Sequence, residues 1–426
     1  MSDAKPSIGE LTSASFKIGC LGFGGPAGQI ALMHRIFVDE KKWIDEARYL
    51  HALNFCTLLP GPEAQQLATY VGWLLHGVRG GVVAGLLFVL PGALVVLALS
   101  WLYAAAYDAP LVAAAFFGIK AAVLALVVDA MIRIARRALK TSISWIIAVT
   151  SFAALFLAQT PFPIVIAAAA AIGLFIASPE QKHQASMPAP SARGSLGAAA
   201  LWGFVWLAPP TLAFALLGPA HVLTEVGALF SSLAVVTFGG AYATLAYVQQ
   251  QAVDAEGWLT AAQMIDGLGL AETTPGPLVL VNQFVGFLAG WREGGAGLAL
   301  AGAAMASWCT FAPSFVWIFA GAPYAERLRA SVRARGALGA ISAAVLGIIA
   351  NLAVWFSAHV LFANVSRAPL GGGLSILAPE WASYNAAAGV LALCALIALL
   401  RFKVGVVWLV LAAAAAGVAL SAAGAI

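Results

Sequence analysis

The chain has 426 residues, of which 62% are hydrophobic and only 9% are charged, and its formal net charge is +4. A soluble domain carries roughly 25% charged residues to cover its surface, so this composition excludes a water-soluble fold. The small net charge gives no support for nucleic-acid binding. Long unbroken apolar runs exclude a transmembrane β-barrel, whose strands alternate apolar and polar residues. We therefore expect an all-α polytopic membrane protein.

The apolar runs predict how many times the chain crosses the membrane. A hydrocarbon core about 30 Å thick requires roughly 20 apolar residues per helix. The first residues, MSDAKPSIGE, lack the short apolar core of a cleavable signal peptide. We expect about thirteen spans, between twelve and fourteen. They lie near 12–33, 50–75, 82–104, 109–130, 143–159, 161–178, 196–218, 226–248, 264–290, 297–320, 336–362, 385–400 and 404–425.

The basic residues predict the orientation of these spans. Cytoplasmic loops carry an excess of Lys and Arg. With the N-terminus in the cytoplasm, the basic residues of 133–140, 182–193, 327–335 and 401–403 all fall on the cytoplasmic side. The segment 34–48 is an exception, because it carries several basic residues and would lie outside. Either this segment lies in the membrane interface or the first helices are re-entrant.

An internal repeat is the most informative pattern in the chain. A shift of 215 positions lays Phe23-Gly24-Gly25 on Phe238-Gly239-Gly240, and Pro60-Gly61-Pro62 on Pro275-Gly276-Pro277, without a gap. Two identical tripeptides at one offset indicate a duplication. An odd number of expected spans separates the two starts, so the second repeat is inverted relative to the first. Inverted-topology repeats around a central site are typical of secondary transporters.

The repeat also divides the chain into domains. Further along, Gly80-Gly81 matches Gly294-Gly295 after a slip of one residue. We expect an N-terminal repeat at 1–178 and a C-terminal repeat at 196–426. The segment 179–195 between them is polar, contains proline and lacks apolar periodicity, so we interpret it as a cytoplasmic linker.

The two Pro-Gly-Pro motifs predict broken helices. Prolines at i and i+2 cannot lie inside a continuous helix, because each lacks an amide proton and its ring clashes with the preceding turn. Non-helical backbone at membrane depth persists where it lines a cavity or is buried in protein. After each break a new half-helix begins with free amides and the positive end of its dipole, and two such ends facing each other form an anion site. The alternative is that these prolines only kink packed helices.

Polar side chains cluster around both breaks. Amide and hydroxyl donors suit an oxyanion, because each of its oxygens requires several hydrogen bonds. We predict a substrate-binding site formed by Gly24, Gly25, Pro26, Asn54, Pro60, Gly61, Pro62, Glu63 and Gln66 in the first half, and by Gly239, Gly240, Glu272, Thr273, Thr274, Pro275, Gly276 and Pro277 in the second.

Three charged residues in the apolar runs invite a functional interpretation. Glu63 and Glu272 flank the two breaks, and a carboxyl group in low-dielectric surroundings can bind a proton near neutral pH, which suggests proton coupling. The alternative is that each carboxylate caps its half-helix or pairs with a buried cation. Lys120 either supplies positive potential to an anion or forms a structural pair with an acid.

We expect no cofactor, no metal site and no enzymatic activity. The cysteines are isolated, without a CxxC pair, and the six histidines show no metal-ligand spacing. The sequence contains no P-loop, GxSxG or HExxH motif. ATP-driven transport and intramembrane hydrolysis therefore have no support.

Several long motifs resemble the chromate ion transporter family in its long, two-domain form. In the first half these are FGGPAGQIALMHRIFVDEKKW (Phe23–Trp43), LNFCTLLPGPEAQQLATYVGW (Leu53–Trp73) and FVLPG (Phe88–Gly92). In the second half they are VTFGGAYATLAYVQQQAV (Val236–Val253), GLGLAETTPGPLVLVNQFVGF (Gly267–Phe287) and GAPYAERLR (Gly321–Arg329). The resemblance spans nearly the whole chain apart from the linker and the C-terminal spans. One departure is Gln29, where many members carry histidine.

The resemblance implies efflux of chromate from the bacterial cytoplasm across the inner membrane, which confers chromate resistance. Sulfate is also a tetrahedral dianion, so it is expected to be carried or to compete. The leading hypothesis is an alternating-access oxyanion transporter driven by a proton or ion gradient. The alternatives are an oxyanion channel or a sulfate transporter on the same frame, and a membrane enzyme that acts on chromate. The expected partners are a chromate- or sulfate-type oxyanion and the lipid bilayer, with no nucleic acid and with a homodimer left open.

Overall fold

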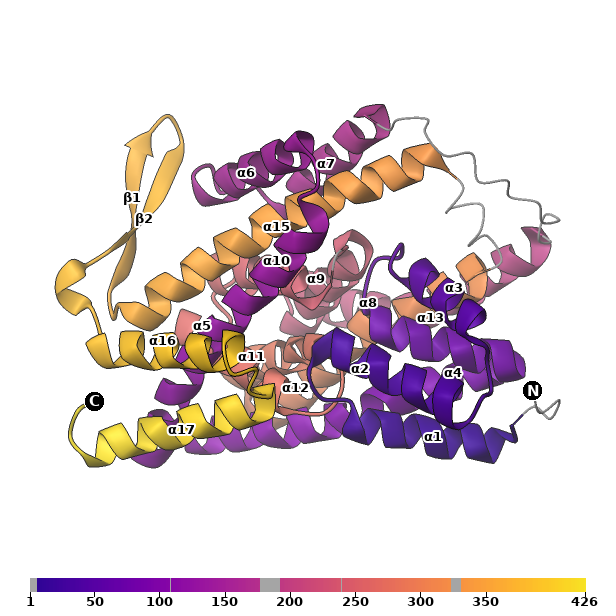
Figure 1. Cartoon of the computed structure of the whole chain (residues 1–426), viewed down its shortest axis with the longest axis horizontal. Helices are drawn as coiled ribbons and strands as arrows, with labels where there is room; N and C mark the ends of the chain where they lie inside the picture. The colour runs from indigo at the N-terminus through magenta and orange to yellow at the C-terminus, as the bar shows by residue number, and fades with distance from the viewer. Residues whose placement is uncertain (1–5, 108, 177–191, 239, 323–330) are drawn as a thin grey trace. The chain divides into compact units, whose positions relative to one another are not determined.

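The computed structural model describes residues 6–107, 109–176, 192–238, 240–322 and 331–426 (Figure 1). Within these ranges the chain is helical apart from one short β-hairpin, as expected for an all-α fold. It forms two compact units, and each unit combines segments from both halves of the sequence. Unit 1 consists of Met1–Ser100, Ser178–Ala241 and Thr274–Ala334, and unit 2 consists of Trp101–Ala177, Tyr242–Thr273 and Arg335–Ile426.

The predicted repeats at 1–178 and 196–426 describe the order of the sequence rather than these units, and their boundaries stay a prediction. Residues 179–191 of the predicted linker lie outside the described part of the chain. The helix that follows begins at Ala192, which is earlier than the expected span at 196–218.

Unit 1 combines the first helices of the chain with helices from its middle. Its elements are α1 (Ile8–Leu21), α2 (Gly25–His34), the π-helix η1 (Arg35–Glu40), α3 (Glu46–Cys56), α4 (Glu63–Ala106) as far as Ser100, α8 (Ala192–Leu217), α9 (Val222–Val236), the 3-10 turn η3 (Leu278–Leu280), α12 (Val281–Phe311) and α13 (Pro313–Gly321). Ser7 starts α1 with a capping box that includes Glu10. Helices α8, α9 and α13 pack around Trp206, Ala234 and Val316.

Helices α4 and α12 are each interrupted by a sharp turn. Gly77 in α4 has φ 61° and ψ −152°, and Gly295 in α12 has φ 71° and ψ −155°. A β-carbon on Gly72 would lie 2.3 Å from the carbonyl oxygen of Gly80, so the two arms on either side of the turn in α4 pack closely. Each of the two helices is therefore a helical hairpin.

These turns correct one detail of the internal repeat. The sequence match of Gly80-Gly81 with Gly294-Gly295 is wrong in register, because the residue with the conformation of Gly295 in the first half is Gly77. Both have a positive φ, which glycine adopts without steric cost. Identity of residue type was a poorer guide here than the backbone conformation that the turn requires.

Unit 2 contains the remaining helices and the β-hairpin. Its elements are the end of α4, α5 (Pro110–Ala138), α6 (Ser142–Phe156), α7 (Phe162–Ile176), α10 (Ala241–Val248) from its second residue, the π-helix η2 (Gln249–Ala255), α11 (Ala261–Thr273), α15 (Val332–Leu361) from Arg335, β1 (Val365–Gly371), β2 (Leu374–Pro379), the 3-10 turn η5 (Trp381–Ser383), α16 (Ala386–Leu400) and α17 (Val406–Ala422). Strands β1 and β2 pair antiparallel between α15 and α16 (Figure 1). Small residues let α5 and α17 approach closely, since a β-carbon on Gly417 would lie 2.2 Å from the carbonyl oxygen of Ala114.

The helices are those of a multi-pass membrane protein. Among the described residues, five helical segments are long and apolar enough to cross a membrane: Glu63–Ala106, Pro110–Ala138, Gly194–Leu217, Leu278–Gly321 and Val332–Leu361. Five shorter apolar helices accompany them, namely α6, α7, α9, α16 and α17. On α8, Phe204 and Leu216 are 71% and 72% exposed, which fits contact with lipid. The total of about thirteen spans stays a prediction.

Besides the two expected spans that contain the Pro-Gly-Pro breaks, two others do not form single helices. The span predicted at 12–33 is divided between α1 and α2, and the span predicted at 226–248 is divided between α9 and α10. The reason is the glycine motif in each, because Gly24 and Gly240 have φ 85° and 95°, which a right-handed helix does not accommodate. Each half therefore has two interruptions where the sequence predicted one.

Hydrogen bonds between the polar loops of unit 2 show the effect of dividing the span 226–248 between α9 and α10. The Gln250 side chain in η2 donates to Thr160 O at 3.2 Å and accepts from Phe162 N–H at 3.0 Å. The β-hairpin also contacts this loop, because Ser375 N–H donates to Leu157 O at 2.9 Å. An uninterrupted span over 226–248 would carry η2 to the opposite side of the membrane from its start. The structure instead places η2 beside a loop that was expected outside.

Candidate functional site

Unit 1 contains two non-helical segments from each half of the chain. In the first half, 22–24 separates α1 from α2, and 57–62 separates α3 from α4. In the second half, residues 237, 238 and 240 lie between α9 and α10, and 274–277 precedes η3. The two breaks predicted at Pro-Gly-Pro are therefore confirmed. The central glycines, Gly61 and Gly276, have φ 105° and 97°, so a β-carbon at either position would strain the backbone.

The two halves exchange backbone hydrogen bonds across these segments. Gly61 N–H donates to Thr237 O at 3.0 Å, and Gly276 N–H donates to Gly22 O at 3.0 Å. The shift of 215 positions that relates Gly61 to Gly276 also relates Gly22 to Thr237. The bonds are therefore reciprocal, which is the pattern of an isologous contact. The two Pro-Gly-Pro segments lie in one region of unit 1 and each is tied to the glycine motif of the other half.

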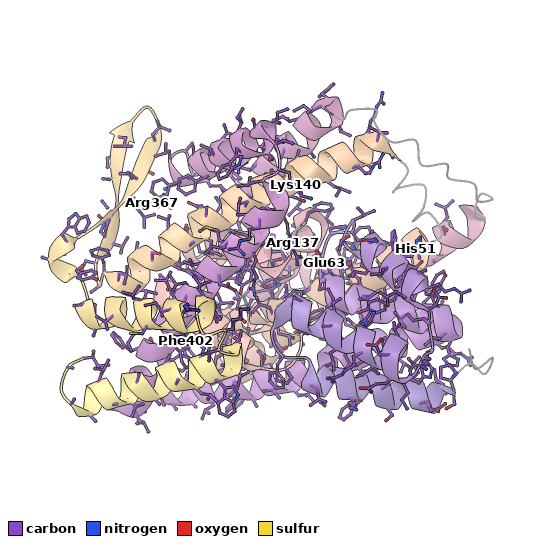
Figure 2. The ribbon with its side chains drawn as sticks, in the orientation of Figure 1. His51, Glu63, Arg137, Lys140, Arg367 and Phe402 are labelled. Carbon is purple, nitrogen blue, oxygen red and sulfur yellow. The ribbon has the colours of Figure 1, made fainter. Side chains whose placement is uncertain are left out.

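A small cavity in unit 1 has walls from both halves. Its lining comprises Pro26, Gln29, Gly61, Pro62, Glu63, Ala64, Gly240, Ala241, Pro277, Leu278 and Val279. The cavity measures about 20 Å³, which is room for about one water molecule. Glu63, which is labelled in Figure 2, and Ala64 are the first residues of α4, and Leu278 and Val279 are the first residues of η3. The first amides of a helix have no intrahelical acceptor, so two helix starts face this cavity with hydrogen-bond donors.

Gln29 crosses between the halves beside this cavity. The side chain is fully buried, and its Nε2 donates to the carbonyl oxygens of Gly22 and Gly276. Its Oε1 finds no hydrogen-bond partner among the described residues. Because two carbonyls hold Nε2, the amide has a fixed orientation. The sequence singled out this position only as a departure from the family pattern, and a buried contact across 247 residues leaves no local signal.

Two further glutamines bond to carbonyls of the opposite half. Gln65 Nε2 donates to Phe311 O at 3.3 Å, and Gln283 Nε2 donates to Ala93 O at 2.9 Å. Each follows a Pro-Gly-Pro break and reaches the hairpin of the other half. Close packing adds to this, since a β-carbon on Gly92 would lie 2.2 Å from Pro275 O.

The remaining first-half residues of the predicted site have other roles. Gln66 is buried, and its Nε2 donates to Pro60 O at 2.7 Å, which closes the turn of the first break. Asn54 is exposed, and its carbonyl accepts from Thr57 Oγ1 at 2.9 Å. The glycine pair starts α2, where Gly24 and Gly25 have φ 85° and 69°. None of these residues lines the described cavity.

The second-half residues of the predicted site divide between the units. Thr274, Pro275, Gly276 and Pro277 belong to unit 1, whereas Glu272 and Thr273 belong to unit 2. Thr273 Oγ1 donates to the carbonyl oxygens of its own helix. Glu272 is buried and accepts a hydrogen bond of 2.6 Å from the hydroxyl of Tyr242. Gly239 lies outside the described residues.

Lys120 has an acidic partner in unit 2. Its Nζ lies 3.5 Å from Oδ1 of Asp266, a residue of α11 outside the predicted site. Its pairing with an acid is thus the second of the two roles considered for this lysine. In the described part of the chain, no group of three or more His, Cys, Asp or Glu side chains is arranged to hold a metal ion.

A second cavity, of about 280 Å³, lies within unit 2. Gln249, Asp254 and Arg367 are among its polar lining residues, and Arg367 lies on β1 (Figure 2). Gln249 Nε2 donates to Asp254 Oδ2 at 2.7 Å, and burial raises the pKa of Asp254. None of the predicted site residues lines this cavity.

A titratable cluster lies at the C-terminal end of α2 in unit 1. His34 Nε2 lies 2.6 Å from Glu46 Oε2, and His34 Nδ1 lies 3.3 Å from Asp39 Oδ2. The hydrogen bond to Glu46, together with the charges of both carboxylates, raises the pKa of His34.

Comparison with known proteins identifies the family. The sequence profile of the chromate transporters matches residues 9–174 and 224–418, which is most of the chain. The chain belongs to the chromate transporter family. Its two matched segments contain both glycine motifs and both Pro-Gly-Pro motifs. No solved structure matches the chain.

Curated chromate transport proteins are similar in sequence to this chain over most of their length. The chain is 35% identical over 354 residues to the chromate transport protein of Pseudomonas aeruginosa, which covers 80% of this chain and 79% of that protein. It is 29% identical over 349 residues to a probable chromate transport protein of Synechococcus elongatus, covering 82% and 84%. It is 27% identical over 356 residues to the chromate transport protein of Cupriavidus metallidurans, covering 82% of each. These relatives are named as transport proteins, which fits a protein that is not an enzyme.

Proposed function

We propose that this protein is a secondary transporter that exports chromate, and related tetrahedral oxyanions such as sulfate, by alternating access. The transport is coupled to an ion or proton gradient. The protein lies in the bacterial inner membrane with its N-terminus in the cytoplasm. Membership of the chromate transporter family supports chromate as the substrate.

The observation that carries this proposal is the cavity in unit 1 that is lined by residues from both halves of the chain. Chromate is a tetrahedral dianion, so its site has to supply several hydrogen-bond donors and favourable potential. The first residues of α4 and of η3, which continues into α12, both line the cavity. The start of a helix provides hydrogen-bond donors and a favourable potential for an anion. Glu63 also lines the cavity, so an anion is accommodated best when Glu63 is protonated.

The size of the cavity favours a carrier over an open channel. A volume of about 20 Å³ does not admit a tetrahedral oxyanion, so the lining has to move apart when the ion binds. The bonds that hold the lining closed are the amides of Gly61 and Gly276 and the Gln29 side chain. In the proposed gate, these bonds break and re-form as the cavity opens alternately to the two sides of the membrane.

The interrupted helices also support a membrane orientation. If each glycine motif and each Pro-Gly-Pro break marks the tip of a re-entrant hairpin, then α1 and α2, and likewise α3 and the first arm of α4, enter and leave from the cytoplasm. The loops beyond these hairpins then keep their expected sides. The basic segment 34–48 then lies inside, which removes the exception to the positive-inside rule. The second half begins from the opposite side, so η2 lies outside, beside the loop around Thr160. This arrangement is an inverted-topology repeat.

Purified protein in liposomes tests the proposal. We expect saturable chromate flux that sulfate inhibits and that an imposed ion or pH gradient accelerates. Flux that does not saturate and ignores the gradient would identify a channel instead. Much faster flux of sulfate than of chromate would identify a sulfate transporter, and loss of Cr(VI) without movement between compartments would identify an enzyme.

A further inference from the structure

We propose that Asp266 in α11 binds the proton whose movement drives transport, with Lys120 as its counter-charge and Tyr103 as its hydrogen-bond donor. This inference rests on the proposed function and names the coupling ion and its site. All three residues belong to unit 2.

The carboxyl group of Asp266 is isolated from water. The side chain is 0% exposed, and Lys120, whose Nζ lies 3.5 Å from Oδ1, is 21% exposed. Ionisable side chains at membrane depth are costly and mark ion or proton pathways more often than they stabilise a fold. Because a well-packed apolar pair would be at least as stable, a stability role does not account for this pair.

The two carboxyl oxygens of Asp266 have different surroundings. Oδ2 accepts a hydrogen bond of 2.9 Å from the hydroxyl of Tyr103. Oδ1 has the long contact to Lys120 and finds no hydrogen-bond partner among the described residues. An ionised carboxylate in which one buried oxygen lacks a hydrogen bond is unfavourable, whereas a proton on the carboxyl group neutralises it. The Tyr103 hydroxyl contacts Oδ2, so Oδ2 is the oxygen to which a proton relayed by that hydroxyl binds.

A route for this proton leads through the end of α4. The ring of Tyr103 lies beside that of Tyr107, with ring centroids 4.8 Å apart and the ring planes tilted by 46°, and Tyr107 follows the last residue of α4. The loop at 107–110 is expected on the outer side of the membrane. A proton from outside reaches Asp266 through the two tyrosine hydroxyls, and the charge of the Lys120–Asp266 pair then changes from zero to +1.

Other titratable groups near Asp266 are few. On α11 itself Glu272 is bound to Tyr242, and on η2 Asp254 is bound by Gln249. Helix α5 contributes Lys120 and, further along, the pair of Asp129 with Arg133, whose Oδ2 and Nη1 lie 3.0 Å apart. Helix α17, which also packs on α11, carries no titratable side chain. Asp266 is thus the buried carboxyl group whose protonation changes the charge beside Lys120.

The test is oxyanion flux in liposomes carrying Asp266→Asn, measured in two ways. Exchange of labelled oxyanion without a gradient should stay within about twofold of the wild type, while the acceleration by an imposed pH gradient should be lost. Asp129→Asn is the matched control, because it removes a carboxyl group from the same unit and should keep the full acceleration. The proposal would be overturned if the pH gradient accelerated flux in Asp266→Asn as it does in the wild type. It would also be overturned if Asp266→Asn lost exchange and acceleration equally while the pH profile stayed unaltered.

A second measurement covers the case in which Asp266→Asn does not fold. Infrared difference spectra of the wild type on a pH change should show the C=O band of a protonated, buried carboxyl group. The double variant Asp266→Asn with Lys120→Met leaves no unpaired buried charge, and it should lack that band. A band that persists in the double variant would overturn the proposal. If the wild type transports oxyanion saturably without any effect of pH, the proton site is wrong and the transport function stands, whereas absence of oxyanion flux refutes the function itself.

Discussion

Gly92 offers a sharp test of the contact between α4 and the second Pro-Gly-Pro motif. A β-carbon at Gly92 would lie 2.2 Å from Pro275 O and 2.8 Å from Cδ1 of Leu280. Non-bonded contacts are favourable at about 3.5–4.0 Å, so Gly92→Ala has to displace Pro275 by roughly 1 Å. The next residue, Gly276, holds Gly22 O at 3.0 Å through its amide, and a shift of that size removes the hydrogen bond.

The magnitude follows from these two losses. The hydrogen bond contributes about 1 kcal/mol and the overpacking costs about 1–3 kcal/mol, so the free energy of unfolding should fall by about 2–4 kcal/mol. Chromate uptake into inside-out vesicles should slow by on the order of tenfold or more, because a displacement of about 1 Å at a binding site has large effects. The matched control is Gly297→Ala in α12, where a β-carbon meets no atom within 4 Å. A Gly92→Ala protein with the Tm and uptake rate of the wild type would refute this close contact.

Three further predictions concern the cavity and its surroundings. Gly61→Ala should lower the free energy of unfolding by about 1–2 kcal/mol and reduce transport, because φ at Gly61 is 105°; denaturant unfolding checks this, and an unaltered midpoint would contradict it. Glu63→Gln should bind oxyanion in alkaline solution as the wild type does in acidic solution; an unchanged pH profile of affinity would leave Glu63 as a helix cap. The raised pKa of His34 means that its pairing with Glu46 stabilises the fold fully below about pH 6.5 and is lost as the pH rises through that raised value. The Tm difference between the wild type and His34→Gln should therefore shrink in alkaline solution and correspond to less than about 1 kcal/mol, because His34 is partly exposed; a difference that grows with pH would contradict this sign.

The sequence predicted the breaks well because their cause is local. Two prolines at i and i+2 with a glycine between them strongly disfavour a helix, so the break between α3 and α4 around Pro60-Gly61-Pro62 has a local cause, although the adjacent Pro209 and Pro210 lie inside α8. The glycine motifs were harder to interpret, since glycine also occurs inside packed membrane helices. Whether Gly24 continues a helix or ends it depends on the contacts that hold its backbone.

The partners of the site residues were not predictable from the sequence. The reciprocal bonds of Gly61 and Gly276 are made by backbone groups, which carry no residue-type signal. The pairing of Lys120 with Asp266 joins residues on different helices, and only packing decides which acid approaches the lysine. Asn54 was included in the predicted site because it is a polar residue near the first Pro-Gly-Pro motif in the sequence. In the structure Asn54 is exposed.

The location of bound chromate tests the central claim most directly. Anomalous diffraction at the chromium edge, from crystals of the protein soaked with chromate, reports this position without any assumption about mechanism. We expect a chromium peak in unit 1, placed so that the chromate oxygens accept hydrogen bonds from the amides of Ala64 and Val279, which line the shared cavity. A chromium peak elsewhere in the protein, with none at that cavity, would contradict it.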